Sequence, residues 1–450
     1  MVRRSIVTAV AAAVAAASAP EAHAVEQRPV VTVYTQDLGF VHEWRTLSLA
    51  AAADTVRIAD IPARIDIASV RLQPAAGRVG RLAYRYDVES GDGLFDRARG
   101  SKVRVTLRGD RLVEGTLLSS DGMWVMVREA DGGVRTLSRA SIDDVRFPEP
   151  PKRLFTRPML EAVIEGGRKG DVPAELSYLT GGMSWSAEHT LVRTGETSGS
   201  WATSVTVDNS TGRDYSGVTL KLIAGNPSRT SAPPMPMMVR TAMMADGGME
   251  KSAMSEQAFA DYHLYTLDRP ATLRDKETQS LSMLESRPVA LTPRYLYRGW
   301  EGRGVRTQLE LRNETAKGLG VPLPGGRVRV FAPDAGNDLQ FAGETTMNHT
   351  ATGEKFTLDV GQAFDLVGER SETANKRISD REREVSIEIK LRNRKKIATT
   401  IVVEEITSGD TDIIAKSRDF VRKDANTIQF TVPVAAGQEA IVTYTLRNRY

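Results

Sequence analysis

The chain has 450 residues, of which 41% are hydrophobic, and its 60 Lys and Arg nearly balance its 57 Asp and Glu. Without a charge excess, no long-range field favours nucleic acid or an anionic membrane surface, so we predict no nucleic-acid partner. Cysteine is absent, which excludes disulfides and lipid attachment to cysteine, so stability must come from apolar area buried in several domains.

Residues 1–24 follow the pattern of a secretory signal peptide. Arg3 and Arg4 precede an apolar stretch from Ile6 to Ala19, and Ala22-His23-Ala24 provides the small residues of a cleavage site. The stretch is shorter than the roughly 20 apolar residues that span a bilayer, and no other segment reaches that length without charges. We expect an exported protein, in the periplasm or associated with the outer envelope, without a transmembrane segment after signal removal.

Strand patterns dominate the rest of the chain and predict a mainly β fold. An N-terminal β domain is expected over residues 25–100, where Val30–Tyr34 and Thr46–Leu49 are alternating or β-branched. Residues 148–152 are Pro148-Glu149-Pro150-Pro151-Lys152, which is typical of a short stiff linker, so we expect a domain boundary there.

Residues 101–147, which precede this linker, predict an SH3-like small barrel inserted into the chain. A tight turn before the last of five short strands lets so short a chain close a barrel and hide its edges. The predicted strands cover 103–107, 112–119, 124–128, 134–137 and 145–147, and the turn covers 139–142. Related barrels bind RNA or peptides, but near-neutral charge and export argue against RNA. A spacer or protein-docking role is therefore expected.

Two further β regions are predicted after the linker. Residues 153–375 are expected to form a β domain with a Met-rich loop at 228–258, and residues 376–450 a C-terminal unit, with β-sandwich (immunoglobulin-like) architecture. Strands that end in Asn209, Asn313 and Asn393 are each followed by a short polar loop and another strand. Asn favours turns and left-handed conformations, so we interpret these residues as structural corners rather than as binding residues.

Seven of the 14 methionines lie between Met235 and Met254, among Pro, Ser, Ala and Gly residues. Thioethers select Cu(I), which makes copper binding one hypothesis. No His or Cys accompanies the cluster, and flexible methionines also form adaptable contacts with partners. A plain loop is the favoured interpretation, with partner contact and copper as alternatives. The copper candidates are Met235, Met237, Met238, Met243 and Met244.

No constellation of residues predicts catalysis, a metal centre or a cofactor. His42-Glu43 and Glu188-His189 each combine an acid with a base, but neighbours on a strand point to opposite faces. None of the 5 histidines has a second His or a Cys at metal-ligand spacing, and no nucleophile elbow or phosphate-binding loop is present. We assign no catalytic, metal-binding or cofactor-binding residues and favour a non-enzymatic protein.

Trp185 and Trp201 lie in strand-like segments. Exposed tryptophans stack on sugars and contact partners, so both residues are candidate sugar or partner contacts. Burial in a core is the favoured interpretation.

Several segments together resemble the mucoidy-inhibitor-A-like family of bacterial exported proteins, whose C-terminal region is a domain of unknown function. The resemblance rests on Val33–Leu38, Ser177–Leu179, Trp185–Ala187, Val207–Gly212 and Leu220–Gly225. It implies an N-terminal β domain, a helical coiled coil and a C-terminal β region, but this chain has residues 101–147 in place of the coiled coil. It implies no catalytic residue, and an aromatic residue at position 189, where this chain has a histidine.

We expect an exported binding or scaffold protein of the bacterial cell envelope, whose partner is an envelope protein or a polysaccharide. Two alternatives remain. One is a periplasmic enzyme that acts on polysaccharide, or a carbohydrate-binding protein; the other is a copper-binding envelope protein that uses the Met-rich loop. A glycoside hydrolase needs two carboxylates about 5 to 10 Å apart across a cleft.

Overall fold

The computed structural model describes residues 28–87, 91–149, 154–225, 254–259, 262–407 and 410–449. Strands in five sheets make up most of this chain, which confirms the predicted mainly β fold. The predicted signal peptide, most of the predicted linker and residues 228–253 of the Met-rich loop lie outside the described residues. The end of that loop is a strand instead, because β16 (Met254–Phe259) pairs with β17 (Tyr262–Leu267).

The first strands of the chain share sheets with strands from much later in the sequence. Residues 25–100 therefore do not form the separate N-terminal domain that we predicted, because their apolar side chains complete one core with residues 160–283. The eight-stranded sheet has the order β16-β17-β15-β1-β2-β12-β4, with β18 also on β15, and the three-stranded sheet has the order β3-β11-β5. Their further strands are β1 (Val30–Tyr34), β2 (Gly39–Leu49), β3 (Asp54–Ile58), β4 (Ile65–Pro74), β5 (Arg78–Arg85), β11 (Met159–Glu165), β12 (Gly170–Thr180), β15 (Tyr215–Ala224) and β18 (Ala271–Leu273).

The C-terminal part of the chain contains a five-stranded and a nine-stranded sheet. The predicted boundary between residues 375 and 376 falls inside one long strand, β24, whose two halves pair with β21 and β25. The sheets have the orders β19-β14-β13-β22-β23 and β27-β30-β25-β24-β21-β20-β26-β29-β28. The strands are β13 (Met183–Arg193), β14 (Ser198–Asn209), β19 (Glu277–Ala290), β20 (Thr292–Arg298), β21 (Gly304–Arg312), β22 (Gly326–Pro333), β23 (Leu339–Met347), β24 (Lys355–Arg377), β25 (Glu382–Asn393), β26 (Thr399–Ile406), β27 (Asp410–Lys416), β28 (Phe420–Asp424), β29 (Thr427–Val434) and β30 (Glu439–Arg449).

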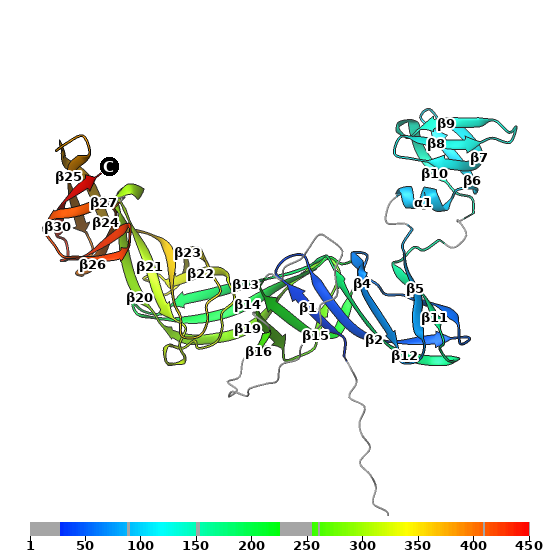
Figure 1. Cartoon of the computed structure of the whole chain (residues 1–450), viewed down its shortest axis with the longest axis horizontal. Coiled ribbons are helices and arrows are strands. Elements are labelled where there is room, and N and C mark those ends of the chain that lie inside the picture. The colour runs from blue at the N-terminus through cyan, green and yellow to red at the C-terminus, as the bar shows by residue number, and fades with distance from the viewer. Residues whose placement is uncertain are drawn as a thin grey trace, which may run out of the picture.

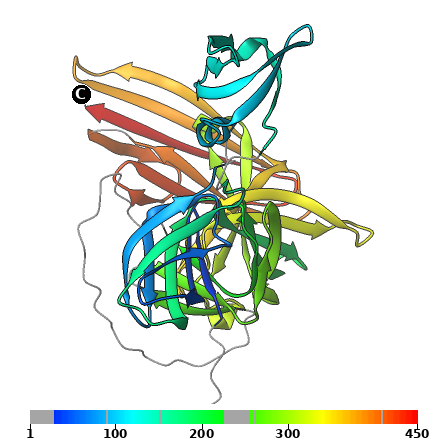
Figure 2. The same ribbon diagram turned by 90° about the vertical axis from the view of Figure 1, so that its right-hand side faces the viewer.

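Long strands connect three hydrophobic cores into one elongated body (Figure 1). Strand β14 contributes Val205 to the core of the eight-stranded sheet and Trp201 to the next core. Strand β24 contributes Leu358 to that second core and Leu366 to the core of the nine-stranded sheet. Figure 2 shows the strands of the C-terminal sheet, orange to red, extending to one side of the body. Neighbouring cores are thus coupled by continuous strands rather than by loops.

A five-stranded unit stands apart from this body (Figure 1). It is inserted between β5 and β11, which pair with each other. Its sheet has the order β10-β6-β7-β8-β9, and its own core includes Val105 and Leu117. The first four strands lie where they were predicted, whereas the last strand begins at Ile142, inside the predicted turn. The SH3-like barrel stays a prediction, and a short helix adds Phe95 to the core. The elements are α1 (Gly91–Arg97), β6 (Lys102–Leu107), β7 (Arg111–Ser120), β8 (Trp124–Arg128), β9 (Val134–Ser138), a 3-10 turn (Arg139–Ser141) and β10 (Ile142–Arg146).

Asp87 and Phe155 form the neck between this unit and the body. The backbone N–H of Asp87 donates to the carbonyl oxygen of Phe155 at 2.9 Å, and the Asp87 carboxylate accepts from the Phe155 N–H at 2.8 Å. The same carboxylate pairs with Arg97 of α1 at 2.8 Å. The inserted chain therefore leaves and re-enters the body at a single point.

Asn209, Asn313 and Asn393 are buried at the ends of β14, β21 and β25, which supports their interpretation as structural corners. In each case the side-chain N–H groups donate to backbone carbonyls of two separate segments. Asn393, for example, donates to Ile397 at 2.8 Å and to Val434 at 3.0 Å. None of the three has a positive φ, so of the two expected conformations the left-handed one does not occur; the side chain fixes the corner.

Candidate functional site

The segments that carry the family resemblance meet at one corner of the body, where the chain passes from β12 to β13. The corner consists of Gly181 and Gly182. Gly182 has a φ of +85°, and a Cβ there would lie 2.7 Å from the carbonyl oxygen of Ser210. Its N–H donates to Asp37 at 2.7 Å, and Asp37 pairs with Arg64 at 2.7 Å. These residues therefore hold two sheets together.

Glu43 and Arg213 form a buried bidentate ion pair. Arg213 directly follows the segment Val207–Gly212, which belongs to the resemblance. Nη1 of Arg213 donates to the carboxylate at 3.0 Å and Nη2 at 2.8 Å, while Arg45 donates to it at 3.0 Å. The Arg213 guanidinium also donates to the hydroxyl of Tyr178 and lies over the ring of Tyr215, 4.7 Å from its centroid. Glu43 is only 2% exposed, so its charge depends on these partners.

Two members of this network have shifted pKa values. Burial raises the pKa of Tyr178 well above its ordinary value, and the neighbouring Tyr215 and Glu43 raise it further. Burial alone would lower the pKa of Arg213, but its hydrogen bonds to Glu43 and the nearby groups raise it overall. The tyrosine hydroxyl stays protonated and the guanidinium stays charged near neutral pH. Neither group is therefore suited to proton transfer there.

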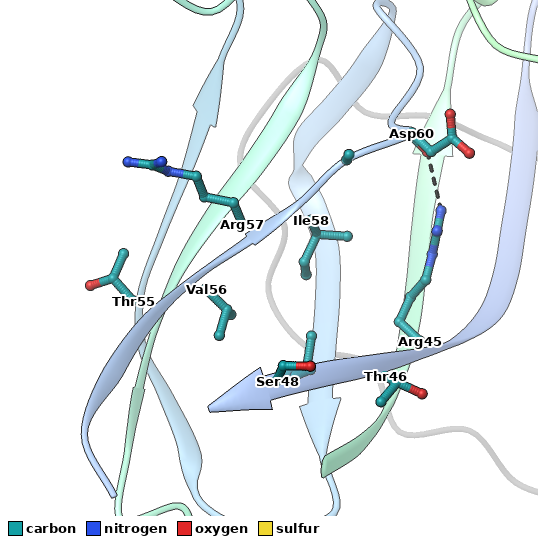
Figure 3. Close-up of a pocket in the computed structure, with 10 residues that line it drawn as sticks. Arg45, Thr46, Ser48, Thr55, Val56, Arg57, Ile58 and Asp60 are labelled. Carbon is teal, nitrogen blue, oxygen red and sulfur yellow. Dashed lines mark hydrogen bonds between the residues drawn. The ribbon is translucent and has the colours of Figure 1, made fainter. Parts of the chain in front are cut away.

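A hollow of about 590 Å³ opens between β2 and β3 (Figure 3). Its apolar lining consists of Leu47, Val56, Ile58 and Ala59. Arg45 and Asp60 lie at one end of it, where Nη2 of Arg45 donates to the Asp60 carbonyl oxygen at 3.1 Å. Arg45 thus links the wall of the hollow to the buried charge of Glu43.

The hollow lacks the groups that hydrolytic chemistry requires. Asp60 is the one carboxylate among its lining residues, whereas glycoside hydrolysis needs two. Ser48 donates to Asp171 at 2.7 Å, but no lining residue is a histidine that could transfer the proton. A second hollow of about 400 Å³, along β28 and β29, also has one carboxylate, Asp419. Neither hollow favours an enzyme that acts on polysaccharide.

The five-stranded unit carries a group of exposed apolar side chains that the sequence analysis did not single out. They are Met123, Trp124, Met126 and Val134, and Trp124 is 42% exposed. In β8 the buried Val125 alternates with Trp124 and Met126, so these two side chains point outward from the sheet. The sequence contained the signal, because a strand with four successive apolar residues has no polar face.

Comparison with known protein families places most of these features in one family. Residues 174–450, more than half of the chain, match the family described as a domain of unknown function (DUF4139). The chain belongs to the DUF4139 family. No curated protein matches the sequence. The DUF4139 region includes the corner at Gly182, Arg213 and the three corner asparagines, whereas Glu43, the larger hollow and the five-stranded unit precede it.

His189, in the DUF4139 region, is buried and has a partner for each ring nitrogen. Nδ1 lies 2.9 Å from the hydroxyl of Thr203, and Nε2 lies 3.0 Å from the carbonyl oxygen of Pro324. The ring lies 5.2 Å from that of Trp201. The histidine ring therefore packs in the core like the aromatic residue that the resemblance implies. Its two nitrogens also contact two polar neighbours.

In the two adjacent acid–base pairs, His42-Glu43 and Glu188-His189, the two side chains do not contact each other. Glu188 pairs with Arg329 at 3.0 Å, while His189 points into the core. His42 contacts Glu175 at 2.5 Å, while its neighbour Glu43 is buried on the other side of β2. The alternation of side chains along a strand thus separates the partners, as predicted.

Acidic pH is expected to destabilise the DUF4139 region through His189. Burial lowers the pKa of His189 from 6.5 to about 4, so between these values the unfolded chain binds a proton that the folded chain does not. The stabilisation is complete above pH 6.5 and decreases by about 3 kcal/mol as the pH falls to 4. Urea unfolding across this range should show a steeper loss for the native chain than for His189→Phe. Equal slopes would contradict the assignment.

Trp185 and Trp201 are core residues of the DUF4139 region, with exposed fractions of 4% and 0%. The indole N–H of Trp185 donates to the carbonyl oxygen of Ile223 at 3.0 Å, and that of Trp201 donates to Thr203 at 3.1 Å. The favoured interpretation is supported. The alternative, in which these residues contact a sugar or a partner, is wrong for both, because both rings are buried.

The methionine candidates for copper, Met235, Met237, Met238, Met243 and Met244, lie outside the described residues, so the copper hypothesis stays a prediction. Met254, at the end of that cluster, is buried in the core of the DUF4139 region. Among the residues that the structure describes, no three His, Asp or Glu side chains are grouped to hold a metal ion. In the same residues, no helix has the length and apolar character needed to cross a membrane.

Proposed function

We propose that the protein is an exported, non-enzymatic binding or scaffold protein of the bacterial cell envelope, as the mucoidy-inhibitor-A-like resemblance also suggests. The observation that carries this proposal is the exposed apolar group of Met123, Trp124, Met126 and Val134, on a unit that projects from an elongated body. Contiguous apolar surface of this kind marks interaction sites in soluble proteins. The partner is an envelope protein.

The body supports this role by its construction. Strand β14 joins the first core to the second, and strand β24 joins the second core to the third. A force applied at one end is therefore transmitted through strands and their hydrogen bonds. The buried Glu43–Arg213 pair and the corner at Gly182 are structural features of this body, and the two hollows lack paired catalytic groups. A rigid rod with a projecting recognition unit is suited to hold a partner at a distance.

Crosslinking in living cells tests the proposal. The full chain is compared with a variant in which residues 91–150 are replaced by a short Gly-Ser turn, which the single neck at Asp87 and Phe155 permits. We expect the full chain to crosslink to a defined envelope protein and the variant to lose it, with the thermal unfolding of the body unchanged. A full chain that captures no envelope protein would contradict the proposed function.

A further inference from the structure

We infer that the β8–β9 hairpin binds an extended, acidic protein segment that carries apolar side chains and pairs with the free edge of β9. This inference rests on the proposed function and names the class of partner. Three features of the hairpin carry it: its uncovered apolar side chains, its unpaired strand edge and the exposed cation Arg128.

The apolar side chains are uncovered because their neighbours on β9 are small. Trp124 lies opposite Ser138, and Met126 lies opposite Thr136. Short side chains next to long ones leave the flanks of Trp124 and Met126 exposed towards the β9 edge. Val134 and Met123 extend the surface, and they are 58% and 68% exposed. A partner side chain that crosses β9 would therefore contact apolar surface.

Among the residues that the structure describes, strand β9 lies at one edge of the five-stranded sheet of this unit. Two hydrogen bonds fix its register: the N–H of Arg139 donates to Met123, and the N–H of Glu129 donates to Gly133. In an antiparallel ladder, alternate residues bond to the neighbouring strand, so Val134 and Thr136 direct their backbone groups away from β8. Such an edge is a template for an added strand, which is how many proteins bind extended peptides.

The charges of this face select an acidic segment. Arg128, at the end of β8, is exposed and forms no ion pair with another described residue. It lies directly opposite Val134 of the edge strand β9, whereas Lys102 in the same cross-strand row lies on β6, two strands further from that edge. Tryptophan, methionine and arginine are also the residue types enriched in protein interfaces. A carboxylate on the partner would pair with Arg128.

Fluorescence anisotropy with the mature full chain tests the inference. The probes are a labelled Glu-Val repeat peptide, a Lys-Val repeat peptide and a Glu-Val peptide with a methylated backbone. We expect binding of the first only, since the second has the wrong charge and the third has no N–H groups to pair with β9. Trp124→Ser and Arg128→Glu should each weaken binding of the Glu-Val peptide at least tenfold.

Leu112→Ser is the matched control, because Leu112 is 56% exposed on the same sheet but lies at the far end of β7. It should leave binding unchanged. Equal binding of all three peptides, no binding, or equal effects of Leu112→Ser and Trp124→Ser would overturn the inference. Self-association that Trp124→Ser abolishes would also overturn it, because the occupant would then be a second copy. If envelope crosslinking persists while peptide binding fails, only this inference is lost.

Discussion

Replacing Asn393 by alanine is expected to lower the free energy of unfolding by about 3 to 5 kcal/mol. The side-chain N–H groups of Asn393 donate to the carbonyls of Ile397, Val434 and Ala435, and its Oδ1 accepts from the N–H of Lys395 at 2.9 Å. Asn393 is fully buried, so its removal leaves these backbone groups without partners and without water. Urea unfolding of the protein measures the loss.

Two further variants show whether this loss comes from the hydrogen bonds. Asn393→Asp keeps the acceptor for Lys395 but cannot donate to the carbonyls, so it should destabilise the protein at least as much as alanine. Asn375→Ala is the matched control: Asn375 is exposed and donates only to Glu372, at 2.8 Å, so its loss should be within about 0.5 kcal/mol. A loss below about 1 kcal/mol for Asn393→Ala would show that the corner does not depend on this side chain.

The corner asparagines also show what the sequence could and could not predict. Each lies at or directly after the end of a strand, and this position alone indicated a structural role. The mechanism was not predictable, because the carbonyls that Asn393 satisfies include that of Val434, which is 41 residues away. Local propensity favoured an unusual backbone conformation, whereas the observed solution is a side chain that joins two loops.

The same limit applies to domain boundaries. Strand patterns predicted where β1, β8 and β25 lie, and the alternation along β25 indicated which of its faces is buried. It did not predict that β1 pairs in parallel with β15, because a periodic pattern specifies a face but not the strand that lies beside it. The five-stranded unit was the exception, since its five strands are consecutive in sequence and pair only with one another. Local contacts made that unit predictable, and long-range pairing made the body unpredictable.

The residues of the candidate site show the same difference between local contacts and long-range pairing. His42 and Glu43 were considered together because they are adjacent, yet the partner that matters for Glu43 is Arg213, 170 residues away. Trp124 and Met126 could have been identified from the sequence without knowledge of a distant partner, because both belong to the continuous apolar run of β8. The features that we propose for binding are thus local, and those that stabilise the body are distant in sequence.

Replacing Arg213 by methionine is expected to cost about 3 to 5 kcal/mol of unfolding free energy. The substitution leaves the carboxylate of Glu43 buried, with Arg45 as its one remaining cation, and removes the donor to Tyr178. A buried charge without its partner loses solvation without compensation, so the folded state is destabilised. Urea unfolding near neutral pH measures this effect, since Tyr178 stays protonated and Arg213 stays charged there.

The double variant Glu43→Leu, Arg213→Met separates the value of the pair from the cost of leaving one charge alone. Removing both charges should restore most of the stability, because apolar groups of similar volume often replace a buried ion pair without loss. Arg64→Met is the matched control: its pair with Asp37 is about half exposed, so we expect a loss of about 1 kcal/mol or less. If the double variant were as unstable as Arg213→Met, the pair would stabilise the fold through its specific geometry, and the desolvated charge of Glu43 would not be the cause.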